Sequence, residues 1–250
     1  MNNLALGFTV AFVAVAIVLS MWQRLGLERE ILVSTVRCAV QLLLVGYVLH
    51  YVFQSRNPLL LLLILGIMTT VAAWNAGQRA KGLAGIRWRV WLALVVTETV
   101  TMSMMVGLDI IEPVPQYIIP ISGMIIGNAM VVSGLLLNQM KREVEASKGE
   151  IETLLALGAT ARQAIQRSLK RSVRASMIPT IDAMKTTGLV QLPGMMTGMI
   201  IAGADPVEAV RYQILILFTI TASAAITSII LSTLSYKLWF TEDERLLPAG

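Results

Sequence analysis

Apolar runs of about twenty residues dominate the chain, and short polar segments separate them. A helix needs about 20 mostly apolar residues to cross the hydrocarbon core of a bilayer. Seven runs are long enough, which predicts an all-α polytopic membrane protein whose residues 1–250 form a single transmembrane domain. The predicted spans are residues 4–22, 33–53, 58–76, 90–108, 117–137, 180–202 and 207–238.

The sixth run carries a proline and a glycine near its middle. Pro193 lacks an amide hydrogen, and its ring clashes with the carbonyl of Leu189, so we expect a kink or break there. Broken membrane helices often line substrate sites, whereas a hinge without ligand contact is the alternative. Whether it is a substrate site or a hinge, the sixth run is expected to have a functional role. Its candidate pathway or hinge residues are Gln191, Pro193, Gly194, Met195 and Met199.

Lysine and arginine gather in alternate loops, namely those after the first, third and fifth runs, and in the tail. The other loops hold only Arg56 and Arg211 and are otherwise acidic. This asymmetry predicts an outside N-terminus and a cytoplasmic C-terminus. Since the net charge of +5 is accounted for by these loops, no nucleic-acid partner is expected. The expected location is the cytoplasmic (inner) membrane, and the polar tail after residue 240 is expected to fray.

The basic loop between the fifth and sixth runs, residues 138–178, has an amphipathic helical pattern. Gly158 is expected to end one helix in a sharp turn, and Thr160 to cap the next helix. A short helix, a glycine turn and a second helix form a compact knob that can enter a groove on another protein. The alternative is a basic helix lying on anionic lipid.

The fourth and fifth runs contain polar groups at membrane depth. Glu98 costs at least ~2.5 kcal/mol to insert there, so it should face the protein interior or water. Met102 and Met105 share its helical face. One interpretation is a stripe of a carboxylate and thioethers that faces a metal ion. The alternative is a neutral or paired carboxyl group among methionines that only pack. Asn128 is a candidate for contact with cargo, or for an interhelical hydrogen bond.

Signatures of catalysis are missing from the sequence. It has one histidine, one cysteine within an apolar run, and no HExxH, GxSxG or P-loop motif. We therefore expect no catalytic residue and no cofactor on this chain. The ligands of any metal stay open, with Glu98, Met102 and Met195 as candidates.

Several motifs resemble those of a known family. Glu152 and Gly158, within ETLLALGAT, are similar to the coupling-helix signature of ABC transporter permeases, although the usual apolar–proline pair is missing at its normal distance. Further motifs resemble the FetB-type permease family, which is associated with iron export in bacteria and aluminium tolerance in plants. They are AAWNA (72–76), PISGMIIGNAM (120–130), LGAT (157–160), IPTIDAMKTTGLVQLPGMMTG (178–198), AGADP (202–206) and AVRYQI (209–214).

The resemblance implies a permease subunit that exports iron or another metal ion. It would form a homodimer in the lipid bilayer and pair with two copies of a separate ATPase, which would bind ATP and Mg²⁺. Gly123 and Gly127 offer a close helix contact for the dimer. The alternative is an autonomous channel or ion-coupled carrier that uses Glu98. The residues expected to couple the chain to the ATPase are Glu152, Leu155, Leu157, Gly158, Ala159, Thr160 and Arg162.

Overall fold

The computed structural model describes residues 7, 9–54, 57–80, 83, 85–241 and 243–247. The chain divides into two compact units, Met1–Asn57 and Pro58–Gly250. In the described part of the chain, the secondary structure consists of helices and two isolated β-bridges. The prediction of an all-α membrane fold is therefore confirmed.

The first unit is a hairpin of α2 (Val10–Trp22) and α3 (Glu28–Gln54). The Ser20 hydroxyl joins the two helices: it donates to Glu28 Oε1 at 2.8 Å and accepts from the Leu27 amide at 3.2 Å. The turn uses left-handed backbone at Arg24 and Gly26. Most apolar side chains of α3 are exposed, so α2 does not cover them.

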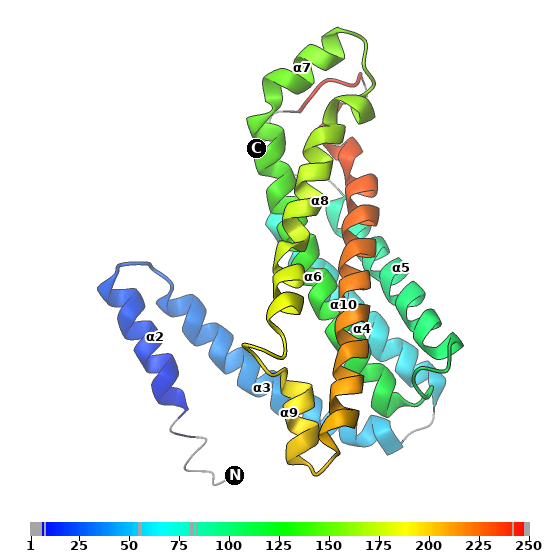
Figure 1. Cartoon of the computed structure of the whole chain (residues 1–250). Coiled ribbons are helices and arrows are strands. Elements are labelled where there is room, and N and C mark those ends of the chain that lie inside the picture. The colour runs from blue at the N-terminus through cyan, green and yellow to red at the C-terminus, as the bar shows by residue number, and fades with distance from the viewer. Residues whose placement is uncertain are drawn as a thin grey trace. The chain divides into compact units, whose positions relative to one another are not determined.

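In the second unit, α6, α8 and α10 run side by side, and α4 and α5 pack against α6 (Figure 1). The short helix α7 lies at one end of this bundle, and α9 packs against α10. The elements are α4 (Pro58–Gly77), η1 (Gln78–Ala80), α5 (Ile86–Gly107), α6 (Pro115–Ala146), α7 (Lys148–Ala156), α8 (Ala161–Thr186), α9 (Gly194–Ile201), α10 (Pro206–Ser235) and η2 (Tyr236–Trp239).

Among the described helices, five are long and apolar enough to cross a membrane: α3, α4, α5, α6 and α10. Exposed leucines and isoleucines on α4, such as Leu62 and Ile67, give it a lipid-compatible surface. Helix α6 has 32 residues. At 1.5 Å per residue it is about 48 Å long, which exceeds the ~30 Å hydrocarbon core. Part of α6 therefore projects beyond the membrane and carries α7.

Two of the seven predicted spans differ from the structure. The first appears as the 13-residue α2, while positions 1–6 and 8 lie outside the described residues. The sixth is interrupted, because α8 ends at Thr186 and α9 has only eight residues. The predicted boundary at residue 180 is also wrong, since α8 continues through Pro179. Packing of α8 against both α6 and α10 keeps it helical despite the missing amide hydrogen.

One apolar core runs from the membrane helices to the end that bears α7. Leu136, Leu137 and Met140 of α6 are almost fully buried, as are Ile151 of α7 and Ile165 of α8. Buried side chains in such a cluster are close-packed and transmit displacement with little compression. The projecting end is therefore a rigid extension of the bundle.

Candidate functional site

The projecting end is a helical hairpin, defined here as the tip: α7, the turn at Gly158 and the first turns of α8. Gly158 has φ +88°, a conformation that favours glycine. The Gly158 amide donates to the Leu155 carbonyl and the Ala159 amide to the Leu154 carbonyl, both at 3.0 Å. These two bonds form a Schellman motif. The predicted glycine turn is confirmed.

Thr160 begins α8 with a capping box. Its Oγ1 accepts from the Gln163 amide at 3.4 Å, and Gln163 Oε1 accepts from the Thr160 amide at 2.9 Å. Both bonds satisfy amides that a helix start would otherwise leave without partners. The predicted cap is confirmed, and it fixes the direction in which α8 leaves the turn.

We expect Thr160→Ala to loosen the start of α8 by about 1 kcal/mol, the usual contribution of such a cap. Amide hydrogen exchange of Gln163 and Ala164 should accelerate by roughly fivefold, while exchange in α6 stays unchanged. The matched control is Thr153→Ala, since the Thr153 hydroxyl bonds the Gly149 carbonyl of its own helix. Equal exchange in both variants would contradict the role of the cap.

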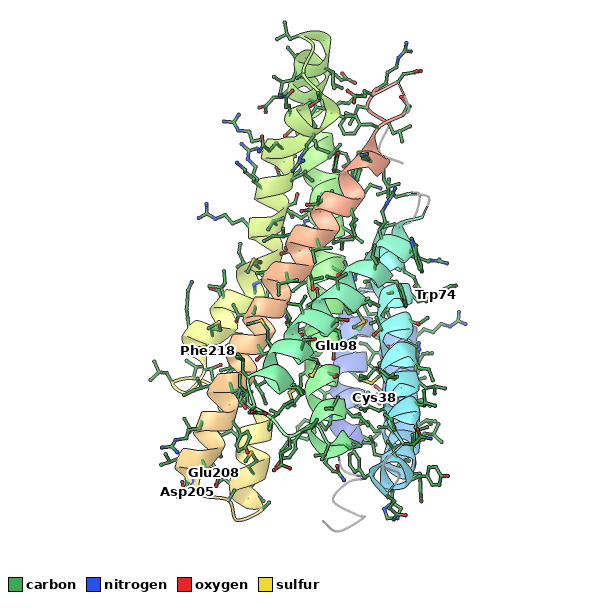
Figure 2. All side chains as sticks on the ribbon, turned by 90° about the vertical axis from the view of Figure 1, so that its right-hand side faces the viewer. Cys38, Trp74, Glu98, Asp205, Glu208 and Phe218 are labelled. Atoms are coloured by element: carbon green, nitrogen blue, oxygen red, sulfur yellow. The ribbon has the colours of Figure 1, made fainter. Side chains whose placement is uncertain are left out.

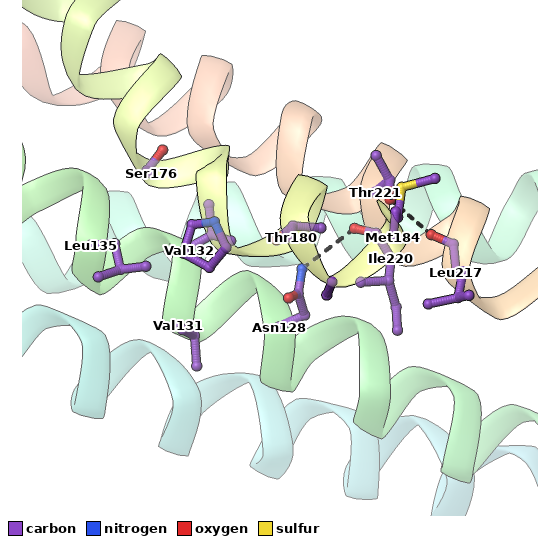
Figure 3. Close-up of a pocket in the computed structure, with 12 residues that line it drawn as sticks. Asn128, Val131, Val132, Leu135, Ser176, Thr180, Met184, Leu217, Ile220 and Thr221 are labelled. Carbon is purple, nitrogen blue, oxygen red and sulfur yellow. Dashed lines mark hydrogen bonds between the residues drawn. The ribbon is translucent and has the colours of Figure 1, made fainter. Parts of the chain in front are cut away.

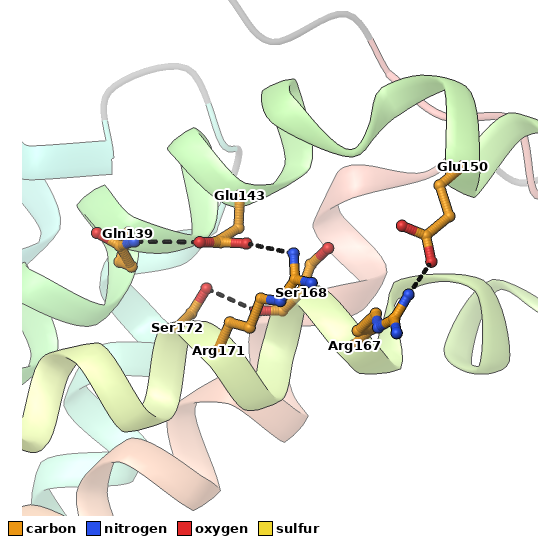
Figure 4. Close-up of polar contacts among 7 residues, drawn as sticks. All are labelled: Gln139, Glu143, Glu150, Arg167, Ser168, Arg171 and Ser172. Carbon is orange, nitrogen blue, oxygen red and sulfur yellow. Dashed lines mark hydrogen bonds and ion pairs between the residues drawn. The ribbon is translucent and has the colours of Figure 1, made fainter.

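Ion pairs join α8 to α7 and to α6 (Figure 4). Arg167 Nη1 lies 2.9 Å from Glu150 Oε1, and Arg171 Nη1 lies 3.6 Å from Glu143 Oε2. These pairs are partly exposed, so each contributes little, and the buried apolar face of α8 supplies most of the stability. Because that face packs against α6, it is not free to insert into lipid, which weakens the membrane-surface alternative.

A groove of about 690 Å³ lies beside the Gly158 turn. Leu157 projects from the turn with 79% of its surface exposed. Arg162 is exposed on the first turn of α8 and lines a neighbouring groove. The structure thus gathers the seven predicted coupling residues at one end of the bundle. The five that line the first groove are Glu152, Leu155, Gly158, Ala159 and Thr160.

The opposite wall of this groove comes from residues 243–246, which follow η2. The expectation of a frayed tail is wrong for residues 241 and 243–247, whereas residues 242 and 248–250 of that tail lie outside the described part of the chain. The Thr241 amide donates to the Arg245 carbonyl at 2.8 Å, and Phe240 forms an isolated bridge with Leu246. Glu244 Oε2 accepts from the Ala161 amide at 3.2 Å. The apolar residues on both sides of the charged TEDER stretch were the signal that predicts such a fold.

The break in the sixth span is confirmed, but it begins at Thr187, six residues before Pro193. Gly188 has φ +88°, and its amide donates to the Gln191 carbonyl at 2.9 Å. Pro193 is the N-cap of α9, and Gly194 is the first residue of that helix.

Three predicted pathway side chains lie at or after this break. The Gln191 side chain is exposed, and Met195 and Met199 of α9 are half-buried. Leu189 and Val190, within the break, are almost fully exposed. The break therefore presents both apolar and polar groups, and the roles of these residues stay predictions.

Glu98 lies at the middle of α5 and is 7% exposed (Figure 2). The prediction that it faces the interior is confirmed. Its two carboxyl oxygens have no hydrogen-bond partner among the described residues, and neither has the hydroxyl of Ser122. Met105 is buried in a cluster with Ile125, and Met102 packs against that cluster, while the pathway role of both methionines stays a prediction.

Asn128 lines a cavity of about 270 Å³ between α6, α8 and α10 (Figure 3). Its Nδ2 donates to the Ile220 carbonyl of α10 at 3.4 Å, so the expected interhelical hydrogen bond is present. The Thr221 hydroxyl donates to the Met184 sulfur within the same lining. Glu98 lies on α5, outside this lining, so this cavity does not bring it together with Asn128.

Metal ligands do not cluster in the described part of the chain: no three His, Cys, Asp or Glu side chains lie close enough to hold one ion. Of the three candidate ligands, Glu98 and Met102 lie on α5 and Met195 lies on α9. The ligand set for a metal therefore stays a prediction.

Comparison with known proteins identifies relatives over nearly the full length. The model of the uncharacterised protein family UPF0014 matches residues 3–240. The chain is 49% identical over 246 residues to UPF0014 membrane protein YjkA of Bacillus subtilis, covering 98% of each chain. It is 40% identical over 246 residues to the probable iron export permease protein FetB of Escherichia coli, covering 98% of this chain and 95% of that protein.

A plant relative is Protein ALUMINUM SENSITIVE 3 of Arabidopsis thaliana, which is 38% identical over 234 residues, covering 94% of this chain and 86% of that protein. No solved structure matches the chain. The family match spans both compact units and includes the tip, the broken span and Glu98. The chain belongs to the UPF0014 family of membrane proteins, which includes a probable permease.

Proposed function

We propose that the chain is the membrane-spanning permease subunit of an ATP-driven ABC transporter, with a separate ATPase as its motor. The observation that supports this most is the continuity of α8. It starts at the Gly158 turn and runs for 26 residues, about 39 Å, to the break at Thr187. A displacement of the tip by a partner would therefore reach the broken span directly.

The tip is the proposed docking surface for the ATPase. It has a rigid apolar core, an exposed Leu157 and a groove that a partner side chain can enter. A few well-seated residues usually supply most of the affinity of such an interface. On this proposal the ATPase binds ATP and Mg²⁺, while this chain contributes no catalytic residue.

The membrane arrangement is part of the proposal. The lysine and arginine distribution supports a cytoplasmic tip, an outside N-terminus and residence in the inner membrane. We propose a permease homodimer bound to two ATPase copies. Gly127 supports close contact with a second copy, since a Cβ there would meet nothing within 4 Å. Gly123, in contrast, already approaches Met68 of α4 in the same chain.

For the substrate we propose a metal ion, with iron as the first candidate and export as the direction. The E. coli relative FetB, a probable iron export permease protein, supports this choice. Backbone groups at the break near Gly188 and the half-buried Met195 and Met199 provide oxygen and thioether groups for a passing ion. These groups suit brief contacts along a path better than a tight resident site.

The docking proposal is tested by charge reversal at the groove. Candidate ABC ATPase subunits of the source organism are co-expressed one by one with a tagged chain and co-purified. We expect one of them to bind wild type and to be lost with Glu152→Lys. Glu145→Lys is the matched control, because Glu145 is an exposed glutamate of α6 that does not line the groove. If the Glu152→Lys and Glu145→Lys chains retain the ATPase equally well, the ATPase does not dock at this groove.

A second candidate function is an ion-coupled carrier centred on Glu98, favoured by its two buried oxygens without hydrogen-bond partners in the described structure. An acidic group at that depth is expensive unless it holds a proton or an ion. Purified chain in lipid vesicles without an ATPase separates the two functions.

We expect no ion movement in these vesicles, and we expect Glu98→Gln to leave partner-stimulated ATPase activity within about threefold of wild type. Glutamine keeps the shape of the side chain, so packing around Ser122 should persist. The carrier becomes the better account if vesicles move ions without an ATPase and Glu98→Gln stops that movement.

A further inference from the structure

Residues 239–241 and 243–247, from the end of η2 onward, fold back onto the tip and are defined here as the tail clamp. In Figure 1 this red segment lies against α7 and the start of α8. Trp239 and Phe240 are buried in the same apolar core as Ile151 of α7 and Ile165 of α8, and Leu246 packs against that core. The clamp thus joins the end of α10 to the helices of the tip.

The contact between Glu244 and α8 is specific. Glu244 Oε2 accepts from the amide of Ala161, the first residue of α8, at 3.2 Å. The capping box satisfies the Thr160 and Gln163 amides but leaves the Ala161 amide available. A carboxylate at this position also interacts favourably with the positive end of the helix dipole. Two segments distant in sequence therefore share the task of holding the start of α8.

The backbone of Glu244 adds a second, independent observation. Its φ is +56°, in the left-handed region that non-glycine residues seldom adopt. Such a conformation persists where surrounding contacts impose it. Here the bridge between Phe240 and Leu246 and the bond from the Leu247 amide to the Trp239 carbonyl close the loop that holds Glu244 in place.

The groove at the Gly158 turn has two walls. The tip supplies one wall, and residues 243–246 of the clamp supply the other. A change in the position of the clamp therefore changes the shape of the groove without altering any residue of the turn itself.

We propose that Glu244 is a positioning residue for ATPase coupling: through the Ala161 amide it fixes the tip against the end of α10. This inference rests on the proposed function and extends it. Movement of the tip would reach the membrane along two routes, directly through α8 and through the clamp into α10.

The test uses the chain co-purified with its ATPase and compares Glu244→Ala, Glu244→Gln and Glu145→Ala. Glu145 is the matched control, because it is an exposed glutamate of α6 that neither lines the groove nor bonds Ala161. We expect Glu244→Ala to lower ATPase stimulation by about three- to tenfold, the usual effect of losing one hydrogen bond of ordinary net strength. Glu244→Gln should retain at least half of the stimulation, since its amide oxygen still accepts from Ala161, and Glu145→Ala should match wild type.

Ala161→Pro tests the same bond from its other side. Proline is tolerated at the first helical position, and Thr160 already has the extended backbone that a following proline requires. This variant removes the amide hydrogen that Glu244 accepts. We expect it to lower stimulation as Glu244→Ala does, and we expect the double variant to be no worse than either single one.

The outcomes separate the clamp from the proposed function. If no ATPase binds wild-type chain, the proposed function fails and the coupling role of Glu244 fails with it. If the ATPase binds and Glu244→Ala stimulates it as well as wild type, only the clamp is overturned. Equal losses in Glu244→Ala and Glu145→Ala, or additive losses with Ala161→Pro, would also overturn it.

Discussion

Replacing Gly158 with valine is expected to uncouple the chain from its ATPase while the membrane helices stay folded. Gly158 has φ +88°, and a left-handed conformation costs an L-residue roughly 1–2 kcal/mol, with more for a β-branched side chain. A Cβ at this position would meet nothing within 4 Å, so the effect comes from the backbone and not from a clash. Partner-stimulated ATPase activity should fall by at least about tenfold.

Gly158→Asn is the matched control for this prediction. Asparagine adopts left-handed backbone more readily than other non-glycine residues and adds a side chain of similar size. Its stimulated activity should remain within about threefold of wild type. Equal losses in the asparagine and valine variants would mean that bulk at the tip matters and that the shape of the turn does not.

Leu157→Ser is expected to weaken ATPase binding by at least about tenfold, as loss of an apolar anchor does at interface centres. Leu157 is 79% exposed, so shortening its side chain should change the stability of the isolated chain little. A large exposed leucine at the end of a projecting hairpin is a natural contact for a partner. This effect is measured as the dissociation constant of the detergent-solubilised complex, by surface plasmon resonance with the chain immobilised.

The control for Leu157 is Gln166→Ser, which shortens another exposed side chain of the projecting end, on α8. Thermal melting of the chain should be unchanged in both variants. If both bind the ATPase as tightly as wild type does, the docking surface does not include the turn, and the proposed site is misplaced.

The features predictable from sequence were those set by local chemistry. Five of the seven predicted spans correspond to long apolar helices, because a bilayer-length apolar run has few other stable states. The turn at Gly158 and the cap at Thr160 were equally predictable, since positive φ and a Thr–x–x–Gln box depend on residues close in sequence.

The features that escaped prediction depend on contacts between distant parts of the chain. Helix α8 continues through Pro179 because α6 and α10 pack on both sides of it, which no local pattern reveals. The tail folds because Glu244 meets Ala161, 83 residues away in sequence, and because Trp239 and Phe240 enter the core of the tip. The local pattern of such a polar stretch predicts a frayed tail, because it does not reveal the distant residues that the stretch contacts.

The pathway residues fall between these cases. The position of Glu98 near the middle of an apolar run correctly predicted that it faces the interior. Its lack of a hydrogen-bond partner in the described structure, in contrast, depends on how α5 and α6 pack. The same holds for Asn128, whose bond to Ile220 depends on the register between α6 and α10. Helical periodicity gives the face of a side chain, whereas tertiary packing decides what that face meets.

The most direct test of the coupling account is ATPase activity in lipid vesicles. The co-purified ATPase is assayed alone, with wild-type chain, and with Glu152→Lys chain reconstituted at the same density. The account predicts stimulation by wild type, its loss with Glu152→Lys, and ATP-dependent metal movement only when both subunits are present. ATPase activity that is indifferent to the chain, or metal movement by the chain alone, would contradict it.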